Sequence, residues 1–322
     1  MNRTRRDILM ASMAGLVCRG AHAASDKWPA MPLTLTVPFS AGGGTDLLAR
    51  TLAQQLGAKW GESIIVENKP GAAGNIGAEL VARDRTRHRL LFTTASIAVN
   101  QTLYKNLSFR LDKEILPVSM LTSSPLVLTV PGTSQVKSLS DLLAAVGKAP
   151  SGLNYGSPGI GTTSHLGCAV LSSTLDFKGT HIPYKGAGQV LTALIGKEID
   201  FSMLAAVAVA PHLRSGALRA IGIAGRASPP GMEGIPLLTL NNPRLEFDNW
   251  QALFAPAVLP ASDIDKLYGA LKEVLKTPDV IHKINSDGAT PLGLSPAETA
   301  IKVDDEVQRY KAIIEQFDIS VL

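Results

Sequence analysis

The feature that most constrains the fold is an alternation of short apolar runs, glycine-rich turns and helical patterns. Residues 33–37 read LTLTV, and from Thr45 apolar residues recur at helical spacing until Gly61, which we expect to end the helix. Further strand patterns lie at 63–68 and 89–95, with a second helical pattern between them. This alternation predicts an α/β protein, with a parallel sheet that has helices on its faces.

The alternation continues to the C-terminus without a repeat or a long flexible linker. Short extended runs near 122–126 and 222–227 connect two sets of strands and helices. Two lobes joined by crossing strands would produce this pattern. The sequence therefore predicts one lobe from residues 24–124 and 226–322, and a second lobe from residues 125–225.

The N-terminus predicts export. Residues 1–23 have a basic start, a short apolar core and an Ala-His-Ala cleavage site, as a signal peptide does. Thr4–Leu9 also resembles a twin-arginine signal, and that export route stays open. Cys18 would leave with the signal, so Cys168 would be left without a disulfide partner. We expect a soluble periplasmic protein.

Charge argues against a nucleic-acid partner. The formal net charge is +4, but the four Arg and one Asp of residues 1–23 account for +3, which leaves +1 for the mature chain. The high pI therefore belongs largely to the signal, and the balance of the mature chain gives no argument for a nucleic-acid partner. We expect it to be a monomer.

The run "SAGGGTD" at residues 40–46 allows several chemistries. A phosphate loop needs a Lys after its glycines, whereas Asp46 follows here and would repel a phosphate. The spacing does not match a dinucleotide loop, and the nearest approach to a nucleophile elbow, Gly156–Gly159, contains Pro158. Neither H-E-x-x-H nor C-x-x-C occurs. We expect no enzyme activity, no metal and no cofactor.

Anion binding is the chemistry that remains. Bare N–H groups at a glycine-rich turn, backed by a helix N-terminus, hold an anion. The sequence offers this arrangement at Ala41–Thr45, Gly159–Thr163 and Lys185–Gly188. Each loop could equally be an ordinary turn between a strand and a helix. Three such glycine-rich loops in one exported, two-lobed chain favour a ligand cleft that clamps a small carboxylate.

The chain resembles a known family over almost its whole mature length. The runs "VPFSAGGGTDLLARTLAQQL", "VENKPGAAGNIGAELVA", "LNYGSPGIGTTSHL", "PYKGAGQVLTALIGKEIDF" and "LFAPAVLPASDIDKL" are similar to those of the tripartite tricarboxylate receptors, also called Bug receptors. The resemblance implies a type II periplasmic binding protein fold with the ligand between its lobes. It also implies that the protein performs no chemistry and delivers a small organic acid to a membrane transporter. Delivery to a membrane sensor is the alternative.

The resemblance also implies where the ligand lies. The Phe39–Asp46 loop would hold one carboxylate, partly through waters, and Ser157–Thr163 would meet the other end. Neighbouring segments match Thr94–Ala98, Tyr184–Gly188 and the stretch after Phe201. The expected ligand-binding residues are Phe39, Ser40, Ala41, Gly42, Gly43, Thr45, Asp46, Thr94, Ser96, Ser157, Gly159, Gly161, Thr162, Thr163, His165, Lys185, Gly186, Leu204 and Ala205.

The sequence allows two roles for several of these residues. Phe39 is either a side wall of the site or a core residue, and Ser40 or Thr45 would cap the helix as well as offer a hydroxyl. Asp46 should order its loop, since it would repel an anion. His165 should order its own loop, and Lys185 is either a positive end of the site or a solvated lysine.

The chain departs from the family pattern at two places. Asp84–Arg89 is strongly basic, where many members have Pro-Asp-Gly-Tyr-Thr. Leu204–Ala206 is apolar, where the family often has an Asp or another polar residue. An amino acid, whose ammonium needs a carboxylate, therefore fits less well than a dicarboxylate, an aromatic acid or an acid with an apolar body.

Overall fold

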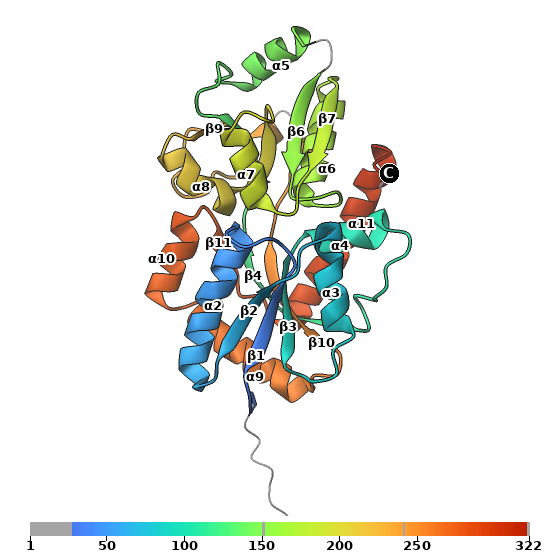
Figure 1. Cartoon of the computed structure of the whole chain (residues 1–322), viewed down its shortest axis with the longest axis vertical. Coiled ribbons are helices and arrows are strands. Elements are labelled where there is room, and N and C mark those ends of the chain that lie inside the picture. The colour runs from blue at the N-terminus through green and yellow to red at the C-terminus, as the bar shows by residue number, and fades with distance from the viewer. Residues whose placement is uncertain (1–27, 150–151, 241, 321–322) are drawn as a thin grey trace, which may run out of the picture.

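The computed structural model describes residues 28–149, 152–240 and 242–320 (Figure 1). The export signal predicted for residues 1–23, and Cys18 with it, lies outside these ranges. Cys168 is buried and has a free thiol. In the described ranges, no helix is both long enough and apolar enough to cross a membrane.

The larger sheet has six strands in the order β11-β4-β10-β3-β1-β2. β1 is parallel to β2 and β3, whereas β10 is antiparallel to β3 and β4. The strands are β1 (Leu33–Val37), β2 (Ile64–Asn68), β3 (Arg89–Thr94), β4 (Ile115–Ser123), β10 (Gln251–Pro256) and β11 (Thr290–Pro291). The parallel pairings confirm the β-α-β arrangement predicted for the start of the mature chain.

Helices cover both faces of this sheet (Figure 1). One apolar core joins α2 and α9 to the sheet, and another joins it to α3, α4 and α11. The helices are α2 (Gly44–Trp60), α3 (Asn75–Ala82), α4 (Ser96–Leu103), α9 (Ala261–Val274), α10 (Pro278–Ser286) and α11 (Pro296–Gln316), with a short 3-10 turn at Ala72–Gly74. We call these helices and the six-stranded sheet lobe 1.

The two ends of α2 differ in how well the sequence predicts them. Gly61 adopts a left-handed φ of 67° and donates its N–H to Gly57 O, so the predicted stop is confirmed. The predicted cap is wrong, because the N-cap is Gly43 and no side chain caps the helix. The Asp46 carboxylate instead accepts the N–H of Gly42, one residue before the cap, at 2.9 Å. Neither Ser40 nor Thr45 is therefore needed to start the helix.

Lobe 2 contains two smaller sheets and four helices. One sheet has the order β8-β5-β9, and the other pairs β6 with β7 in parallel. A bridge between Tyr155 and Phe201 links the two sheets. The elements are β5 (Leu126–Pro131), α5 (Leu139–Gly147), β6 (Leu153–Ser157), α6 (Thr163–Thr174), β7 (Gly179–Pro183), α7 (Ala187–Ile195), β8 (Ser202–Ala205), α8 (Ala206–Arg214) and β9 (Leu218–Ala224).

The chain passes between the lobes twice, and the two crossings lie side by side. β4 leads directly into β5, and the return path runs from β9 to β10. The backbone of Phe247 bonds to Leu126 on one side and to Ala224 on the other. Asp248 accepts the Ser124 N–H and the Ser123 hydroxyl, both at 2.7 Å. This carboxylate therefore ties the two crossings together.

Part of the return path stays beside lobe 2. Ile223 donates its N–H to Pro236 O and forms a bridge with Leu237, and the Thr239 hydroxyl donates to Gly225 O. Short 3-10 turns follow at Leu238–Leu240 and Pro243–Leu245. The lobe limits predicted from the sequence stay a prediction. From these contacts we propose that the return crossing lies near Asp248 rather than at 222–227.

Candidate functional site

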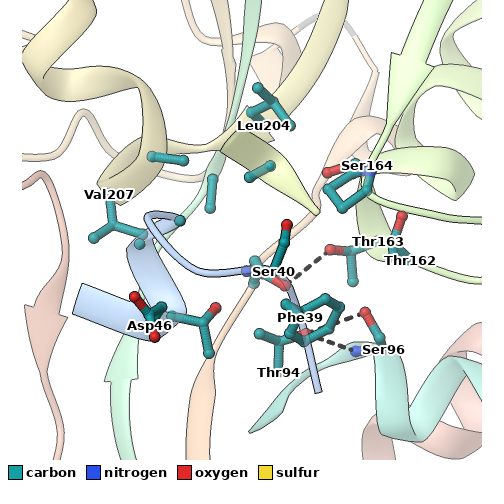
Figure 2. A pocket seen from close by; sticks show the side chains of 18 residues that line it. Phe39, Ser40, Asp46, Thr94, Ser96, Thr162, Thr163, Ser164, Leu204 and Val207 are labelled. Carbon is teal, nitrogen blue, oxygen red and sulfur yellow. Dashed lines mark hydrogen bonds between the residues drawn. The ribbon is translucent and has the colours of Figure 1, made fainter. Parts of the chain in front are cut away.

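A cavity of about 40 Å³ lies where the two lobes meet (Figure 2). A single water molecule needs about 10–15 Å³ of comparable space, so the cavity is nearly closed in this arrangement of the lobes and a ligand would enter it while the lobes are apart. The cavity is lined by Phe39, Ser40, Gly43, Gly44, Thr45, Asp46, Thr94, Ser96, Pro158, Thr162, Thr163, Ser164, Ala187, Leu204, Ala205, Val207, Ala208 and Asn249.

The loop after β1 supplies the lobe 1 wall. Phe39 is 8% exposed and belongs to the core that joins α2 to the sheet, while it also lines the cavity. Phe39 is therefore a core residue that also borders the cavity, and its contact with a ligand stays a prediction. The Ser40 hydroxyl lines the same wall, is buried and has no hydrogen-bond partner among the described residues. This hydroxyl is a free donor and acceptor at the cavity.

Asp46 orders this loop, as predicted. Its carboxylate is 2% exposed and binds Arg50 through two nitrogens at 3.0 Å, Asn68 at 3.0 Å and the Gly42 N–H at 2.9 Å. Burial raises the pKa of Asp46, but hydrogen bonds from Arg50, Gly42 and Asn68 outweigh burial and lower it below its ordinary value. The carboxylate stays ionised, and Arg50 compensates its charge beside the cavity.

Five helices begin at this cavity. The first turns of α2, α4, α6, α7 and α8 each contribute lining residues. A helix N-terminus carries a partial positive charge of about half an elementary charge and N–H groups without intrahelical acceptors. At α8 two of these groups already have acceptors, since Ala206 N–H donates to Pro125 O and Val207 N–H to Ser124 Oγ. Helix N-termini that converge in this way favour an anion.

Hydroxyl groups from lobe 2 face the lobe 1 wall across the cavity (Figure 2). Thr162 caps α6, since its Oγ1 accepts the His165 N–H at 3.3 Å. The Thr163 hydroxyl donates to Asn249 Oδ1 at 3.0 Å. Asn249 lies on the return crossing, so this bond links lobe 2 to the connection between the lobes. The amide nitrogen of Asn249 is a further donor on a residue that lines the cavity.

Another part of the lobe 2 wall is apolar. It contains the side chains of Leu204, Ala205, Val207 and Ala208 from β8 and α8, together with Ala187 from α7. No Lys, Arg or His lines the cavity within the described part of the chain, and Asp46 is the one carboxylate there. The same ranges contain no cluster of three or more His, Cys, Asp or Glu side chains that could hold a metal ion.

A pair of stacked histidines supports the lobe 2 loop from behind. The rings of His165 and His181 lie 4.2 Å apart, centre to centre. The Ser157 hydroxyl lies 2.7 Å from His181 Nε2 and donates its single proton to Gly159 O, so the Nε2–H of His181 donates to Ser157. His165 Nδ1 accepts the Gly161 N–H at 3.4 Å. Both neutral rings therefore fix the backbone of this loop.

Both histidines are held in the neutral form. Burial lowers the pKa of His165 to about 4. Burial, and the neighbouring His165, lower the pKa of His181 to about 3. A proton on His165 Nδ1 would face the Gly161 N–H, so ionisation would remove a bond that shapes the loop. The expectation that His165 orders its loop agrees with this geometry.

Eleven of the nineteen predicted residues line the cavity. The other eight do not: Ala41, Gly42, Ser157, Gly159, Gly161, His165, Lys185 and Gly186. Ala41, Gly42 and Lys185 are exposed, whereas Ser157 and His165 lie behind the loop. Direct ligand contact by any residue stays a prediction.

Seven lining residues are not among those predicted from the sequence: Gly44, Pro158, Ser164, Ala187, Val207, Ala208 and Asn249. Gly44, Pro158 and Ala187 lie within loops predicted to bind the ligand. No local pattern marks Asn249, which reaches the cavity through the path of the return crossing.

Glycines allow the two lobes to touch around the cavity. A Cβ on Gly186 would lie 2.1 Å from Ser40 Oγ, and one on Gly44 would lie 2.8 Å from Val207 Cγ1. The Ser40 N–H donates to Lys185 O at 3.3 Å, and the Tyr104 hydroxyl donates to Ile160 O at 3.0 Å. These contacts join lobe 1 to lobe 2, so the structure shows the lobes closed on one another.

Two α/β lobes, a double crossing and an interlobe cavity that favours anions define a two-lobed solute-binding protein. Residues 48–319 match the model of the tripartite tricarboxylate transporter family receptor, and the chain belongs to this family. It is 29% identical to protein BugT of Bordetella pertussis over 320 residues, with 98% of each chain covered.

Solved structures share the fold. A protein of R. palustris with adipate has a TM-score of 0.88 and 27% identity, with 92% of this chain and 100% of that chain covered. MatC from Rhodopseudomonas palustris with bound malate has a TM-score of 0.84 and 29% identity, with 89% and 100% covered. The type II binding-protein fold expected from the sequence is confirmed.

Proposed function

We propose that this protein is a periplasmic receptor that closes on a small organic carboxylate and presents it to a membrane transporter. The observation that carries the proposal is the cavity itself, where five helices begin and where no cationic side chain is found among the described lining residues. Oriented N–H groups and helix ends stabilise a negative charge without an Arg or a Lys. The chain belongs to a family of transporter receptors, which supports a role in transport.

The carboxylate of the ligand would bind between the loop after β1 and the start of α6. Ser40 has a buried hydroxyl without a partner among the described residues, and Thr162 and Thr163 face it from lobe 2. The Thr162 and Thr163 hydroxyls donate to Gly159 O and Asn249 Oδ1 in this structure, so each would have to turn its proton away from that acceptor to meet a carboxylate. Each partly buried helix N-terminus contributes up to about 2 kcal/mol toward an anion. Binding would add contacts from both lobes at once, so the ligand would stabilise the closed state over the open one.

The body of the ligand would lie against Leu204, Val207 and Ala208. A ligand ammonium there would lose its hydration and find no carboxylate partner, because Arg50 already compensates Asp46. Burying an unpaired charge is costly. A dicarboxylate with an apolar chain fits better than an amino acid, and adipate and malate are ligands of the two R. palustris proteins named above.

A thermal-shift screen tests the ligand class. The mature protein would be heated with mono-, di- and tricarboxylates, and with aspartate and glutamate as ammonium-bearing counterparts. A ligand at 100 times its Kd adds about 2.7 kcal/mol of stability, which raises the Tm of a chain of this length by roughly 4 °C. We expect such a rise for at least one dicarboxylate and a much smaller one for the amino acids. A flat response to every acid would refute the proposed ligand class.

Matched variants test the site. Thr163→Val removes a hydroxyl on the cavity wall with little change in shape, and we expect at least a 5-fold rise in Kd by calorimetry. Thr51→Val is the control, because its hydroxyl donates to Leu47 O on an exposed part of α2 and does not line the cavity. Equal affinity of both variants would contradict the assignment of the lobe 2 wall.

The transport role has its own test. Cells that lack this protein would be given the radiolabelled acid found in the screen, and uptake should return when the gene is restored. Binding in vitro with unchanged uptake in the deletion strain would leave the ligand class intact and refute the role in transport.

A further inference from the structure

One polar side chain reaches the interlobe cavity from the connection between the lobes. Asn249 lies on the return crossing, directly before the fully buried Trp250. The Asn249 N–H donates to Ser124 O on the other crossing at 2.9 Å, and Trp250 O accepts the Ala95 N–H of lobe 1 at 3.1 Å. The backbone is therefore anchored on both sides of Asn249, which fixes the point from which its side chain reaches the cavity.

The amide of Asn249 is held in one orientation. The Thr163 hydroxyl donates to Oδ1 at 3.0 Å, so the acceptor end of the amide already has a partner. The other end, Nδ2, carries two N–H groups. Nδ2 has no acceptor among the described residues, and it is not one of their buried polar atoms without a partner. The free end of this amide is therefore a donor that is open to a ligand.

This donor can meet an anion without losing a bond. The Thr162 and Thr163 hydroxyls would first have to turn their protons away from Gly159 O and Asn249 Oδ1. The N–H groups of Nδ2 have no such acceptor to leave. A hydrogen bond to an ionised carboxylate is also roughly twice as strong as one between neutral groups. Asn249 is therefore ready to bind a ligand carboxylate in the arrangement that the structure shows.

The same amide is unsuited to an ammonium group. An ammonium has three N–H donors and no acceptor, so it cannot form a hydrogen bond with Nδ2. Oδ1 already accepts the Thr163 proton, and Asp46, the one carboxylate on the described wall, already binds Arg50. An ammonium here would lose its hydration without gaining a partner, which is costly. The amide therefore discriminates between a plain acid and an amino acid.

We propose that Asn249 is a specificity-determining residue, which selects dicarboxylates over amino acids by donating from Nδ2 to a ligand carboxylate. The inference rests on the proposed function, because it assigns a partner to one end of the same ligand. Asn249→Asp changes the charge of this group with almost no change in shape. One carboxylate oxygen would still accept the Thr163 proton, whereas the other would repel a ligand carboxylate and attract an ammonium.

Three matched pairs of acids test the preference: succinate with aspartate, glutarate with glutamate, and adipate with 2-aminoadipate. The members of a pair differ by one ammonium group, and calorimetry gives the ratio of their Kd values. We expect the unaltered mature protein to bind at least one diacid more tightly than its amino counterpart. Asn249→Asp should raise the Kd of that diacid by about 30-fold or more and lower the Kd of the amino acid, because a donor to a charged group is lost and a like charge is added.

Two further variants separate specificity from a merely structural role. Asn106→Asp is the matched control, because Asn106 is exposed and lies outside the cavity, and both Kd values should stay unchanged. Asn249→Ala keeps the test valid if Asn249→Asp fails to fold, and it should raise the Kd of the diacid by about 10-fold and that of the amino acid less.

The outcomes separate this inference from the proposed function. Tighter binding of the amino acids by the unaltered protein would overturn the role of Asn249. Diacid binding with an unchanged ratio of Kd values in both Asn249 variants would do the same, and would leave the carboxylate receptor intact. Binding of no acid at all would refute the proposed function together with the inference.

Discussion

Closure of the lobes depends on the missing side chain of Gly44, and Gly44→Ala tests this. A Cβ at this position would lie 2.8 Å from Val207 Cγ1 and 3.2 Å from Val207 Cγ2. Both distances are too short for carbon atoms, whose best separation is about 3.5–4.0 Å. Gly44 belongs to lobe 1 and Val207 to lobe 2, so the clash exists only when the lobes meet.

The expected cost follows from this overlap. Overpacking by one methyl group costs about 1–3 kcal/mol in a packed contact. If the whole cost falls on the closed state, the Kd for the acid rises about 5- to 150-fold. The isolated lobe should not lose stability, since Gly44 begins α2 and Ala is a better helix residue than Gly.

Calorimetry with the best acid from the thermal screen measures the effect, and small-angle scattering measures closure. Val207→Ala removes both clashing methyl groups, so the double variant should recover most of the lost affinity. Gly188→Ala is the control, because its Cβ would meet Ala41 O at an ordinary 3.8 Å. A wild-type Kd for Gly44→Ala, or no recovery in the double variant, would refute the reasoning.

Three further predictions follow from the supports of the site. His165 should make stability depend on pH. Because burial lowers its pKa to about 4, the neutral ring contributes its full stabilisation to the folded protein above about pH 6.5, and about 3 kcal/mol of the free energy of unfolding is lost as the pH falls toward 4. Urea unfolding should show this loss, and His165→Gln should reduce it; an equal slope in the variant would contradict the assignment. Asp46→Ala should cost about 2–3 kcal/mol in the same assay because it removes the hydrogen bonds of a buried carboxylate to Gly42, Arg50 and Asn68, whereas Asp112→Ala, from an exposed ion pair, should cost less than about 0.5 kcal/mol. Ser138→Ala should cost about 1 kcal/mol, since Ser138 caps α5; an unchanged midpoint would count against the cap.

The start of lobe 1 was predictable because its signals are local. β1 is an apolar run, and the apolar spacing of α2 and the glycine at its end are set within a few residues. The N-terminal cap of α2 was not predictable from the same signals. Ser40 and Thr45 have capping side chains, but Asp46 accepts the nearby N–H because Arg50 and Asn68 hold it in place.

The cavity was predictable in part. The glycine loops that open α2, α6 and α7 could be read as anion sites, and each contributes to the wall. The role of the residues behind the wall depends on partners far away in the chain. His165 stacks on His181, and Thr163 bonds Asn249 on the return crossing, so neither partner has a local pattern that reveals it.

The sequence by itself determined the α/β class, most strands and helices, the family, and the glycine loops that expose backbone N–H groups. The class, the elements and the loops follow from spacing and composition over short stretches, where hydrogen bonds and apolar faces are local, whereas the family follows from the resemblance of longer motifs. The tertiary structure decided which loops meet, since the crossings at Ser124 and Asp248 set how the lobes approach one another. It also decided the apolar wall, because Val207 in the first turn of α8 meets Gly44 of lobe 1 at the cavity.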